Sequence, residues 1–202
     1  MEIRQFQTIT TLDDIKARAK LIATGSHYRK LGVPGEELAH NCATCDGFLY
    51  KDKSVAVIGG GDGAASEALF LANIAKSVTI LNRSPLRASA ILQQQLAEKG
   101  IKIITNWQTS RIEKGLKLYN IRGEVLEVDG VFINIGLDPA TDWLSPEILD
   151  ETKHIKTDTH HQTTIPGVFA AGDVRAGQKK QIIFAAADGA AAALDIRTYL
   201  NK

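Results

Sequence analysis

The stretch Lys53–Leu81, KSVAVIGGGDGAASEALFLANIAKSVTIL, decides the fold class of this chain. Within it, Val55–Ile58 is an apolar run typical of a buried strand, and the three glycines that follow predict a tight turn. Ala64–Ala75 carries apolar residues at helical spacing, and Val78–Leu81 predicts a second buried strand. A strand, a helix and a strand in this order form a βαβ unit with parallel strands and a right-handed connection. We therefore predict an α/β fold built on parallel sheets.

The glycines of this stretch follow the pattern G-x-G-x-x-A, with Gly59, Gly61 and Ala64 at its fixed positions. The first glycine permits the turn, the second lets a pyrophosphate approach the backbone, and the small third residue lets helix and strand pack closely. Free N–H groups and the helix dipole favour an anion at this point. We interpret the turn, with Asp62 inside it, as a dinucleotide site; a glycine-rich turn that only packs two elements is the alternative.

The end of the second strand distinguishes NADH from NADPH. An NADH site usually places an acid about 20 residues after the glycines, where it holds the ribose hydroxyls. Here the sequence reads Asn82, Arg83, Ser84, with Arg87 close behind. The absence of an acid and the presence of two guanidinium groups favour the 2′-phosphate of NADPH, while a plain surface role for the arginines is the alternative.

Cys42 and Cys45 are the only cysteines, and Asp46 follows them directly. A zinc site needs four ligands, or three and a water, and only His40 lies next to the pair. An inert structural pair is a second interpretation, because a bare C-x-x-C arises by chance. We favour a third, a redox dithiol in which Asp46 passes a proton to or from a departing thiolate.

The segment Gly167–Asp173, GVFAAGD, predicts an apolar strand that ends in a carboxylate, at the sheet edge where α/β proteins bind ligands. The remaining aromatic and histidine residues carry no such pattern. We expect Trp107 and Trp143 to be packing residues. We expect surface positions for the histidines that lack ligand spacing with a carboxylate, which are His27, His154, His160 and His161.

Composition narrows the class of protein. The 202 residues include 24 Lys plus Arg and 23 Asp plus Glu, and the net charge of +1 gives no reason to expect nucleic acid or a membrane surface as a partner. No apolar run approaches the roughly 20 residues that span a bilayer, and the N-terminus lacks the pattern of a signal peptide. We expect a cytoplasmic protein with one large core or two smaller ones.

Two segments carry a family resemblance: Cys42–Leu81, which begins CATCDG, and Ile165–Val174, IPGVFAAGDV. With this motif order, the chain resembles low-molecular-weight thioredoxin reductases from Ile22 to its C-terminus, rather than the larger glutathione-reductase group. The resemblance implies a Rossmann-like architecture with two dinucleotide-binding domains. Residues 1–40 and 130–202 would form a partial FAD-binding domain, and residues 41–129 an NAD(P)H-binding domain that carries the C-x-x-C.

The resemblance also implies a flavoprotein disulfide oxidoreductase that uses FAD and NADPH. Cys45 would lie against the flavin, Cys42 would exchange with the disulfide of thioredoxin, and Asp46 would be the general acid and base. The glycine motif would hold the pyrophosphate of NADPH, and its 2′-phosphate would meet Arg83 and Arg87. The residues implied at FAD are Thr24, Gly25, Gly172, Asp173 and Gln181, the last opening the helix that faces the flavin ring. Members of the family are typically homodimers.

The sequence departs from the family pattern in four places. The family begins with a βαβ unit and a second G-x-G-x-x-G for FAD, and residues 1–21 do not supply one. Glu37–Cys42 is short, the segment Gly115–Glu124 is abbreviated, and Ser84 stands where a second arginine is expected. An alternative hypothesis is therefore an NAD(P)H-binding remnant that has lost FAD and its catalysis.

Overall fold

The computed structural model describes residues 8–201, and the chain divides into two compact units. The central unit is Tyr28–Gly136, and the terminal unit comprises the residues up to His27 together with those from Leu137 onward. The family resemblance implies domain boundaries after residues 40 and 129. Residues 28–40 and 130–136 belong to the central unit in the structure, because His40 and strand β9 (Gly130–Ile133) both join its sheet.

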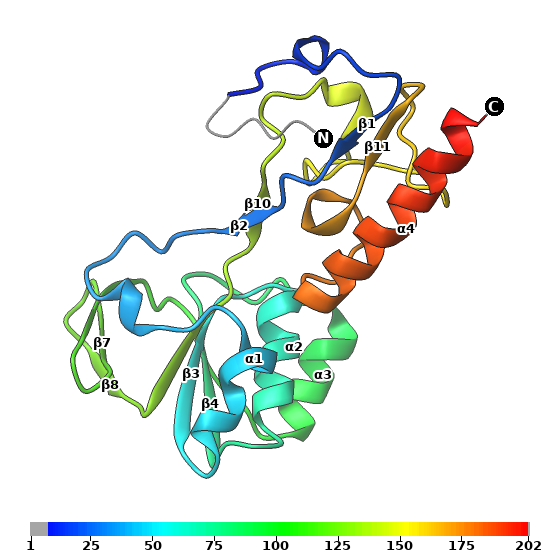
Figure 1. The fold of residues 1–202 in the computed structure, drawn as a ribbon. Helices are drawn as coiled ribbons and strands as arrows, with labels where there is room; N and C mark the ends of the chain where they lie inside the picture. The colour runs from blue at the N-terminus through cyan, green and yellow to red at the C-terminus, as the bar shows by residue number, and fades with distance from the viewer. Residues whose placement is uncertain (1–7, 202) are drawn as a thin grey trace. The chain divides into compact units, whose positions relative to one another are not determined.

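The sheet of the central unit has four parallel strands in the order β5-β4-β3-β9. Strand β3 (Ser54–Ile58), helix α2 (Asp62–Leu71) and strand β4 (Ser77–Leu81) form the predicted βαβ unit. Helix α3 (Ala90–Glu98) then leads to β5 (Lys102–Ile104). Helices α2 and α3 lie side by side in Figure 1. Because α2 and α3 follow consecutive strands, they cover the same face of the sheet.

Alternate residues of β3 belong to two different cores. Val55 and Val57 pack with the alanines of α2 and with Leu96 of α3. Ala56 and Ile58 point to the opposite face, where a small antiparallel sheet covers them. A strand buried on both faces reads as a continuous apolar run, as the sequence of β3 does. The covering sheet consists of β6 (Thr109–Glu113), β7 (Lys117–Asn120) and β8 (Val125–Glu127).

The segment before β3 holds three short helices: η2 (Glu36–Leu38), α1 (Ala43–Asp46) and η3 (Gly47–Tyr50). They pack on the central unit in two ways. Leu38 belongs to the core beneath β6–β8, while Ala43 and Tyr50 pack in the core of α2 and α3. The C-x-x-C segment is therefore fixed to the same body as the βαβ unit.

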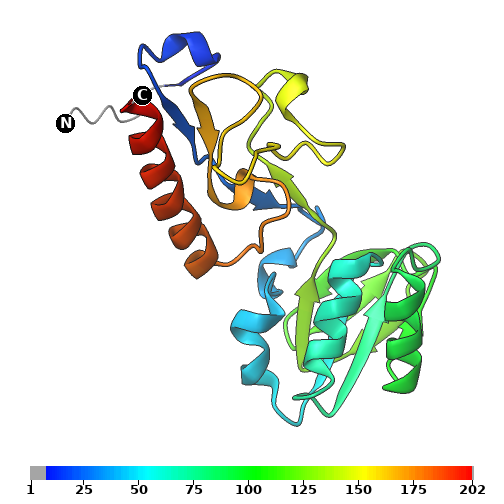
Figure 2. The same ribbon diagram turned by 90° about the vertical axis from the view of Figure 1, so that its right-hand side faces the viewer.

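The terminal unit brings distant segments together. Strand β1 (Lys20–Ile22) pairs in parallel with β11 (Val168–Ala170), and helix α4 (Ile182–Leu200) closes the chain, as Figure 2 shows. Strands β2 (Ser26–Tyr28) and β10 (Leu137–Pro139) pair where the chain passes between units. The short helices of the terminal unit are η1 (Leu12–Asp14), η4 (Pro146–Ile148) and η5 (Gly172–Val174). No helix within residues 8–201 combines the length and apolarity needed to cross a bilayer.

Candidate functional site

The two cysteines form a disulfide at the start of α1. The Cα atoms of Cys42 and Cys45 lie 5.3 Å apart, and the Cys45 N–H donates to the Cys42 sulfur at 3.2 Å. Cys42 is the N-cap of the helix, and Cys45 is exposed to solvent. The two sulfurs are bonded to each other, and the described residues contain no cluster of three His, Cys, Asp or Glu that could hold a metal ion. This geometry supports the redox interpretation and gives the zinc interpretation no ligands beyond the pair.

Asp46 is held by a histidine that the sequence analysis considered only as a zinc ligand. Its Oδ2 lies 2.8 Å from Nδ1 of His40, and Nε2 of the same ring lies 2.7 Å from the hydroxyl of Tyr50. Burial, and then the charge of Asp46, raise the pKa of the Tyr50 phenol. The acid beside the dithiol is thus the end of a hydrogen-bonded chain of three side chains.

Glu67 of α2 is a further acidic residue at the dithiol that the motifs did not reveal. Its Oε1 accepts a hydrogen bond from the Ala43 N–H at 3.2 Å, and its Oε2 is buried without a partner among the described residues. Burial raises the pKa of this carboxyl group. One signal was available, because Glu67 is an acid within the apolar run of a helix whose neighbours Ala64, Ala65 and Ala68 are buried.

A cavity of about 810 Å³ lies at the carboxyl ends of the parallel strands of the central unit. The chain reverses direction across the sheet between β3 and β9, since β4 and β5 lie on one side of β3 and β9 on the other. Open α/β sheets bind ligands at such a switch point. The cavity is lined by the turn after β3, the end of β4 and the turn after β9, with Gly59–Gly61, Gly63, Leu81–Arg83, Arg87 and Asn134–Gly136.

The glycine turn meets the steric requirements of a pyrophosphate site. Gly59 has φ +154°, and a Cβ there would overlap the carbonyl oxygen of Asn134. At Gly61, by contrast, a Cβ would meet nothing within 4 Å, so the backbone faces open space. Ala64 is buried at the helix–strand contact. The turn therefore leaves room for a ligand at the helix N-terminus, where N–H groups favour an anion.

The structure gives different positions to the polar residues predicted around this turn. Arg83 and Arg87 are exposed side chains at the cavity. Asn82 is buried, and its Nδ2 donates to the carbonyl of Ser84 at 2.6 Å, so it shapes the loop after β4. Asp62 accepts the N–H of Ser89 at 2.7 Å, which ties the start of α2 to the start of α3.

Several residues that line the cavity lie outside the predicted set. Trp107 and Asn134 come from loops distant in sequence from the glycine motif. Trp107 is 5% exposed, as expected of a packing residue, and its indole N–H has no partner among the described residues. Asn134 follows the buried strand β9 directly, so a polar residue at the end of an apolar strand was the available signal. The other unpredicted lining residues are Arg29–Val33, Ile58, Gly60, Gly63, Leu81, Gln108, Thr109, Ile135 and Gly136.

The residues predicted at FAD lie together in the terminal unit. The Thr24 hydroxyl donates to the carbonyl of Ala140 at 2.9 Å, and Gly25 accepts from the Ala140 N–H at 3.0 Å. The neighbouring Ser26 donates to the backbone carbonyl of Asp173 at 2.7 Å. Asp173 follows Gly172 in η5, and its Oδ1 is buried without a partner among the described residues. Gln181 is the N-cap of α4, as expected from the sequence.

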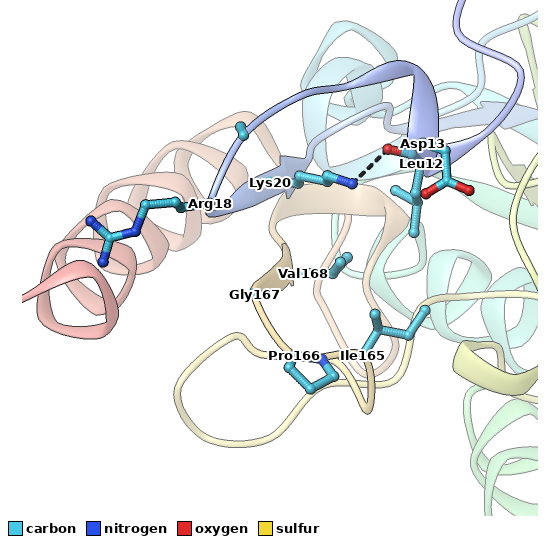
Figure 3. Close-up of a pocket in the computed structure, with 9 residues that line it drawn as sticks. Leu12, Asp13, Arg18, Lys20, Ile165, Pro166, Gly167 and Val168 are labelled. Carbon is cyan, nitrogen blue, oxygen red and sulfur yellow. Dashed lines mark hydrogen bonds between the residues drawn. The ribbon is translucent and has the colours of Figure 1, made fainter. Parts of the chain in front are cut away.

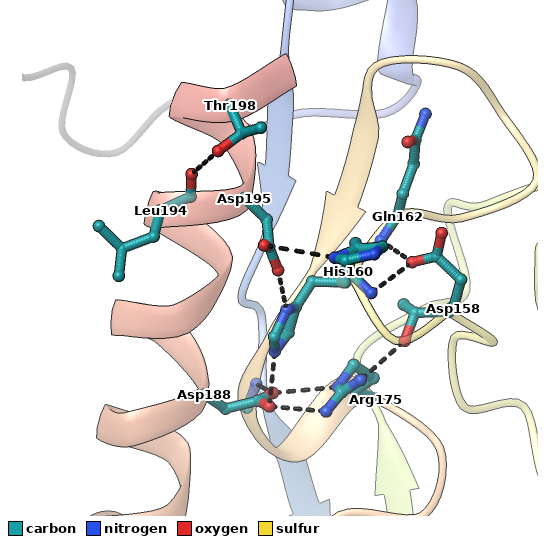
Figure 4. A network of polar contacts seen from close by, with 11 residues as sticks. Asp158, His160, Gln162, Arg175, Asp188, Leu194, Asp195 and Thr198 are labelled. Carbon is teal, nitrogen blue, oxygen red and sulfur yellow. Dashed lines mark hydrogen bonds and ion pairs between the residues drawn. The ribbon is translucent and has the colours of Figure 1, made fainter. Parts of the chain in front are cut away.

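The expectation that the histidines lie on the surface is wrong for His161, which is 8% exposed. Its Nδ1 lies 2.7 Å from Oδ2 of Asp195, and its Nε2 lies 3.1 Å from Oδ1 of Asp188. Figure 4 shows Asp188 and Asp195 on α4, with the Asp188 carboxylate turned toward Arg175. The two acids are seven residues apart, which places them on one face of a helix, but only the fold reveals that the face meets His161.

His154 is half-buried, and burial lowers its pKa, whereas His27 and His160 are exposed as expected. A second hollow, of about 310 Å³, lies between η1, β1 and the loop before β11 (Figure 3). Lys20 spans it and donates to the carbonyl of Leu12 at 2.7 Å. None of the residues predicted at the active or cofactor sites lines this hollow.

Comparison with known proteins agrees with the motifs and the geometry. The family of pyridine nucleotide-disulphide oxidoreductases matches residues 3–189. The chain belongs to this family. Among curated proteins, thioredoxin reductase of Listeria innocua is 39% identical over 218 aligned positions, which cover 98% of this chain and 68% of that protein. Thioredoxin reductase of Streptomyces coelicolor is 42% identical, and the alignment covers 92% of this chain and 63% of that protein.

A solved structure supports the same grouping. The crystal structure of thioredoxin reductase from Streptococcus pyogenes matches with a TM-score of 0.80 and 39% identity, over 90% of this chain and 65% of that one. The chain thus spans about two thirds of the length of these reductases. The resemblance inferred from the motifs and the predicted α/β fold with parallel sheets are both confirmed.

Proposed function

We propose that this chain acts as a disulfide oxidoreductase of the thioredoxin reductase type. It would pass electrons from NADPH through FAD to the Cys42–Cys45 pair, and from there to thioredoxin or a similar small disulfide protein. The observation that carries the proposal is the disulfide itself, which closes at the exposed start of α1 in the unit that also holds the glycine-turn cavity.

The central unit offers a fitting site for NADPH. Gly61 leaves open space above the start of α2 for a pyrophosphate, and Arg83 and Arg87 lie at the same cavity. The described residues that line this cavity include no Asp or Glu that would repel a 2′-phosphate. Arginine matches phosphate oxygens with paired hydrogen bonds. Asp62 would act indirectly, through its bond to Ser89.

The terminal unit offers groups that fit FAD. The unpartnered Oδ1 of Asp173 needs a donor, because buried polar groups are almost always hydrogen-bonded, and a ribityl hydroxyl supplies one. Thr24, Gly25 and Gly172 lie near it, and Gln181 opens α4. When bound, FAD would accept hydride from NADPH and supply the electron pair that reduces the disulfide.

The chain's own residues would carry out the exchange with the protein substrate. The thiolate of Cys42 would attack one sulfur of the substrate disulfide, and a mixed disulfide would form as the other substrate sulfur leaves. Cys45 would then attack the Cys42 sulfur and release the reduced substrate, which restores the internal disulfide. Asp46 would donate or accept the proton that accompanies each departing or attacking sulfur.

The test is turnover of the purified chain with FAD, NADPH and oxidised thioredoxin, followed by loss of NADPH absorbance. Turnover should require FAD and both cysteines, and Cys42→Ser should keep reduction of the flavin by NADPH while it loses transfer to thioredoxin. Continued transfer by Cys42→Ser would contradict the assigned roles. NADPH binding by calorimetry without any turnover would instead support the alternative of a non-catalytic nucleotide-binding module.

We also propose a cytoplasmic homodimer. Apolar side chains exposed on α4 support an interface with a second copy of the chain: Ile182 is 90% exposed, Ile183 is 73% exposed and Leu194 is 55% exposed. Sedimentation of the purified chain tests this proposal, and a monomer at micromolar concentration would contradict it. The net charge of +1 offers no support for nucleic acid or a membrane surface as partner.

A further inference from the structure

The side chains of Tyr50, His40 and Asp46 form a continuous hydrogen-bonded chain that ends at Asp46, the residue directly after Cys45 of the disulfide. We propose that His40 is a positioning residue for the dithiol: it orients the Asp46 carboxyl group and supplies it with the proton that a departing thiolate needs. This inference concerns the dithiol of the proposed function, but it can be tested without NADPH or FAD.

The backbone of His40 is fixed to the sheet. Its N–H donates to the carbonyl of Val131 at 2.8 Å, and its carbonyl accepts from the N–H of Ile133 at 2.7 Å. The imidazole stacks on the buried ring of Phe132, with centroids 5.2 Å apart and planes at 29°. Because backbone and ring are both held, the two nitrogens face the same partners continuously, which a positioning role requires.

Tyr50 is held equally firmly. Its ring meets Phe132 edge-on at 5.5 Å, and a Cβ at Gly130 would overlap the Tyr50 ring, so only glycine leaves room for it. Burial and the nearby Asp46 charge raise the pKa of Tyr50, which keeps its hydroxyl protonated at neutral pH. A protonated hydroxyl can either donate to Nε2 of His40 or accept from it.

This arrangement lets His40 gain or lose a proton while both hydrogen bonds persist. In neutral His40, Nδ1–H donates to the Asp46 carboxylate and Nε2 accepts from Tyr50. In the imidazolium, Nε2–H donates to the Tyr50 oxygen instead. Two further titratable groups contact this part of the molecule: Lys53, whose Nζ lies 5.6 Å from the centroid of the Tyr50 ring, and Glu67, which accepts from the Ala43 N–H.

The step that uses this proton is cleavage of the internal disulfide. A thiolate of the reductant attacks one sulfur, the bond between Cys42 and Cys45 breaks, and the second sulfur leaves with the electron pair. Asp46 passes a proton to that sulfur, and His40 passes one to Asp46. With dithiothreitol as reductant, its second thiol completes the exchange, so one dithiol is oxidised and two protein thiols form.

The test is the rate at which dithiothreitol reduces the disulfide of the full chain, measured by maleimide labelling of the new thiols from pH 5 to 9. Rates are divided by the thiolate fraction of dithiothreitol. His40→Gln should lower this rate by about tenfold or more near neutral pH, because general acid catalysis contributes at least roughly that factor, and should remove its pH dependence. His27→Gln, at an exposed histidine, is the matched control and should retain the native profile.

Tyr50→Phe provides a second variant that keeps the ring and its packing on Phe132. Without the hydroxyl, the pH profile should move, because the imidazolium loses the acceptor at Nε2. A His40→Gln profile that superimposes on the native one overturns the proposal, as does an unchanged Tyr50→Phe profile if His40→Gln fails to fold. If His40→Gln loses NADPH turnover but keeps the native dithiothreitol profile, the positioning role of His40 is contradicted, while the proposed function stands. If His40→Gln alters the dithiothreitol profile and the native chain shows no NADPH turnover, the positioning role of His40 is supported although the proposed function fails.

Discussion

Replacing Asp188 with asparagine should destabilise the terminal unit, because the Asp188 carboxylate is the centre of a buried network on α4. Its Oδ1 lies 2.6 Å from Arg175 Nη2 and 3.1 Å from His161 Nε2, and its Oδ2 accepts from Arg175 Nε at 3.1 Å and the Gly172 N–H at 2.8 Å. In Asp188→Asn, the amide nitrogen must face donors on one side, and the partly buried guanidinium of Arg175 loses its counter-charge.

The expected loss of folding free energy follows from the interactions that asparagine keeps. Breaking a buried ion pair by removing one charge costs about 3–5 kcal/mol, and asparagine keeps the hydrogen bonds of its oxygen, so we expect about 3 kcal/mol. Domains are stable by only roughly 5–15 kcal/mol, and a loss of this size would move a urea midpoint by about 1–2 M.

The two tryptophans allow the units to be observed separately, since Trp107 lies in the central unit and Trp143 in the terminal one. In a Trp107→Phe background, fluorescence should report the shifted midpoint of the terminal unit. Asp195→Asn is the matched control, because the Asp195 side chain is 26% exposed and, within residues 8–201, contacts only His160 and His161, so its effect should be much smaller. A loss below about 1 kcal/mol in Asp188→Asn would refute the argument that this network is buried and tightly coupled.

Three further predictions concern binding and pH. Gly59→Ala should weaken NADPH binding by more than about tenfold in calorimetry, because the new methyl group overlaps the Asn134 carbonyl at φ +154°; unchanged affinity would show that the turn does not contact the nucleotide. Replacing Arg83 and Arg87 together with alanine should weaken NADPH binding by about tenfold or more and leave NADH binding unchanged, and an equal loss for both would contradict a 2′-phosphate site. Although burial works to raise it, the Gly172 N–H and Arg175 hold the pKa of Asp188 below its ordinary value, so its stabilisation is present above the unfolded pKa of about 3.9 and is lost as pH falls through the folded pKa. The stability difference between native chain and Asp188→Asn should therefore vanish in urea titrations well below pH 4, and a constant difference down to pH 2.5 would count against this linkage.

The parts of the fold that sequence predicted are those with local causes. The run Val55–Ile58, the glycines after it and the spacing of Ala64–Ala75 each act over a few residues, and the structure has β3, the turn and α2 there. Gly100 is another local cause: it directly follows the C-cap of α3 at φ +66°, a conformation that glycine adopts without steric cost. Local pattern was sufficient because each element buries the face that its own periodicity defines.

The parts that sequence did not predict depend on segments meeting from a distance. The sequence analysis found only that the stretch before the cysteines is short, yet the backbone of His40 bonds to β9, some ninety residues away along the chain. His161 likewise looked exposed until α4 supplied Asp188 and Asp195. Asn134 and Trp107 line the cavity at the glycine turn, and both come from loops without a motif. In each case the polar pattern was visible, but its partner was set by topology.

Helix α2 joins the glycine turn to the dithiol within one body. Its first residues follow the turn, Glu67 bonds the N–H of Ala43, and Gly47 packs against Phe70 and Leu71 at its other end. At about 1.5 Å of rise per residue, Glu67 lies roughly 8 Å along the helix axis from Asp62. The glycine turn and the C-x-x-C segment therefore contact α2 at separate points. The groups proposed for FAD belong to the other unit, so neither unit alone contains the whole path of the proposed electron transfer. If the proposals hold, the roles are divided accordingly: the central unit would bind the nucleotide and carry the proton chemistry of the dithiol, and the terminal unit would supply the flavin contacts.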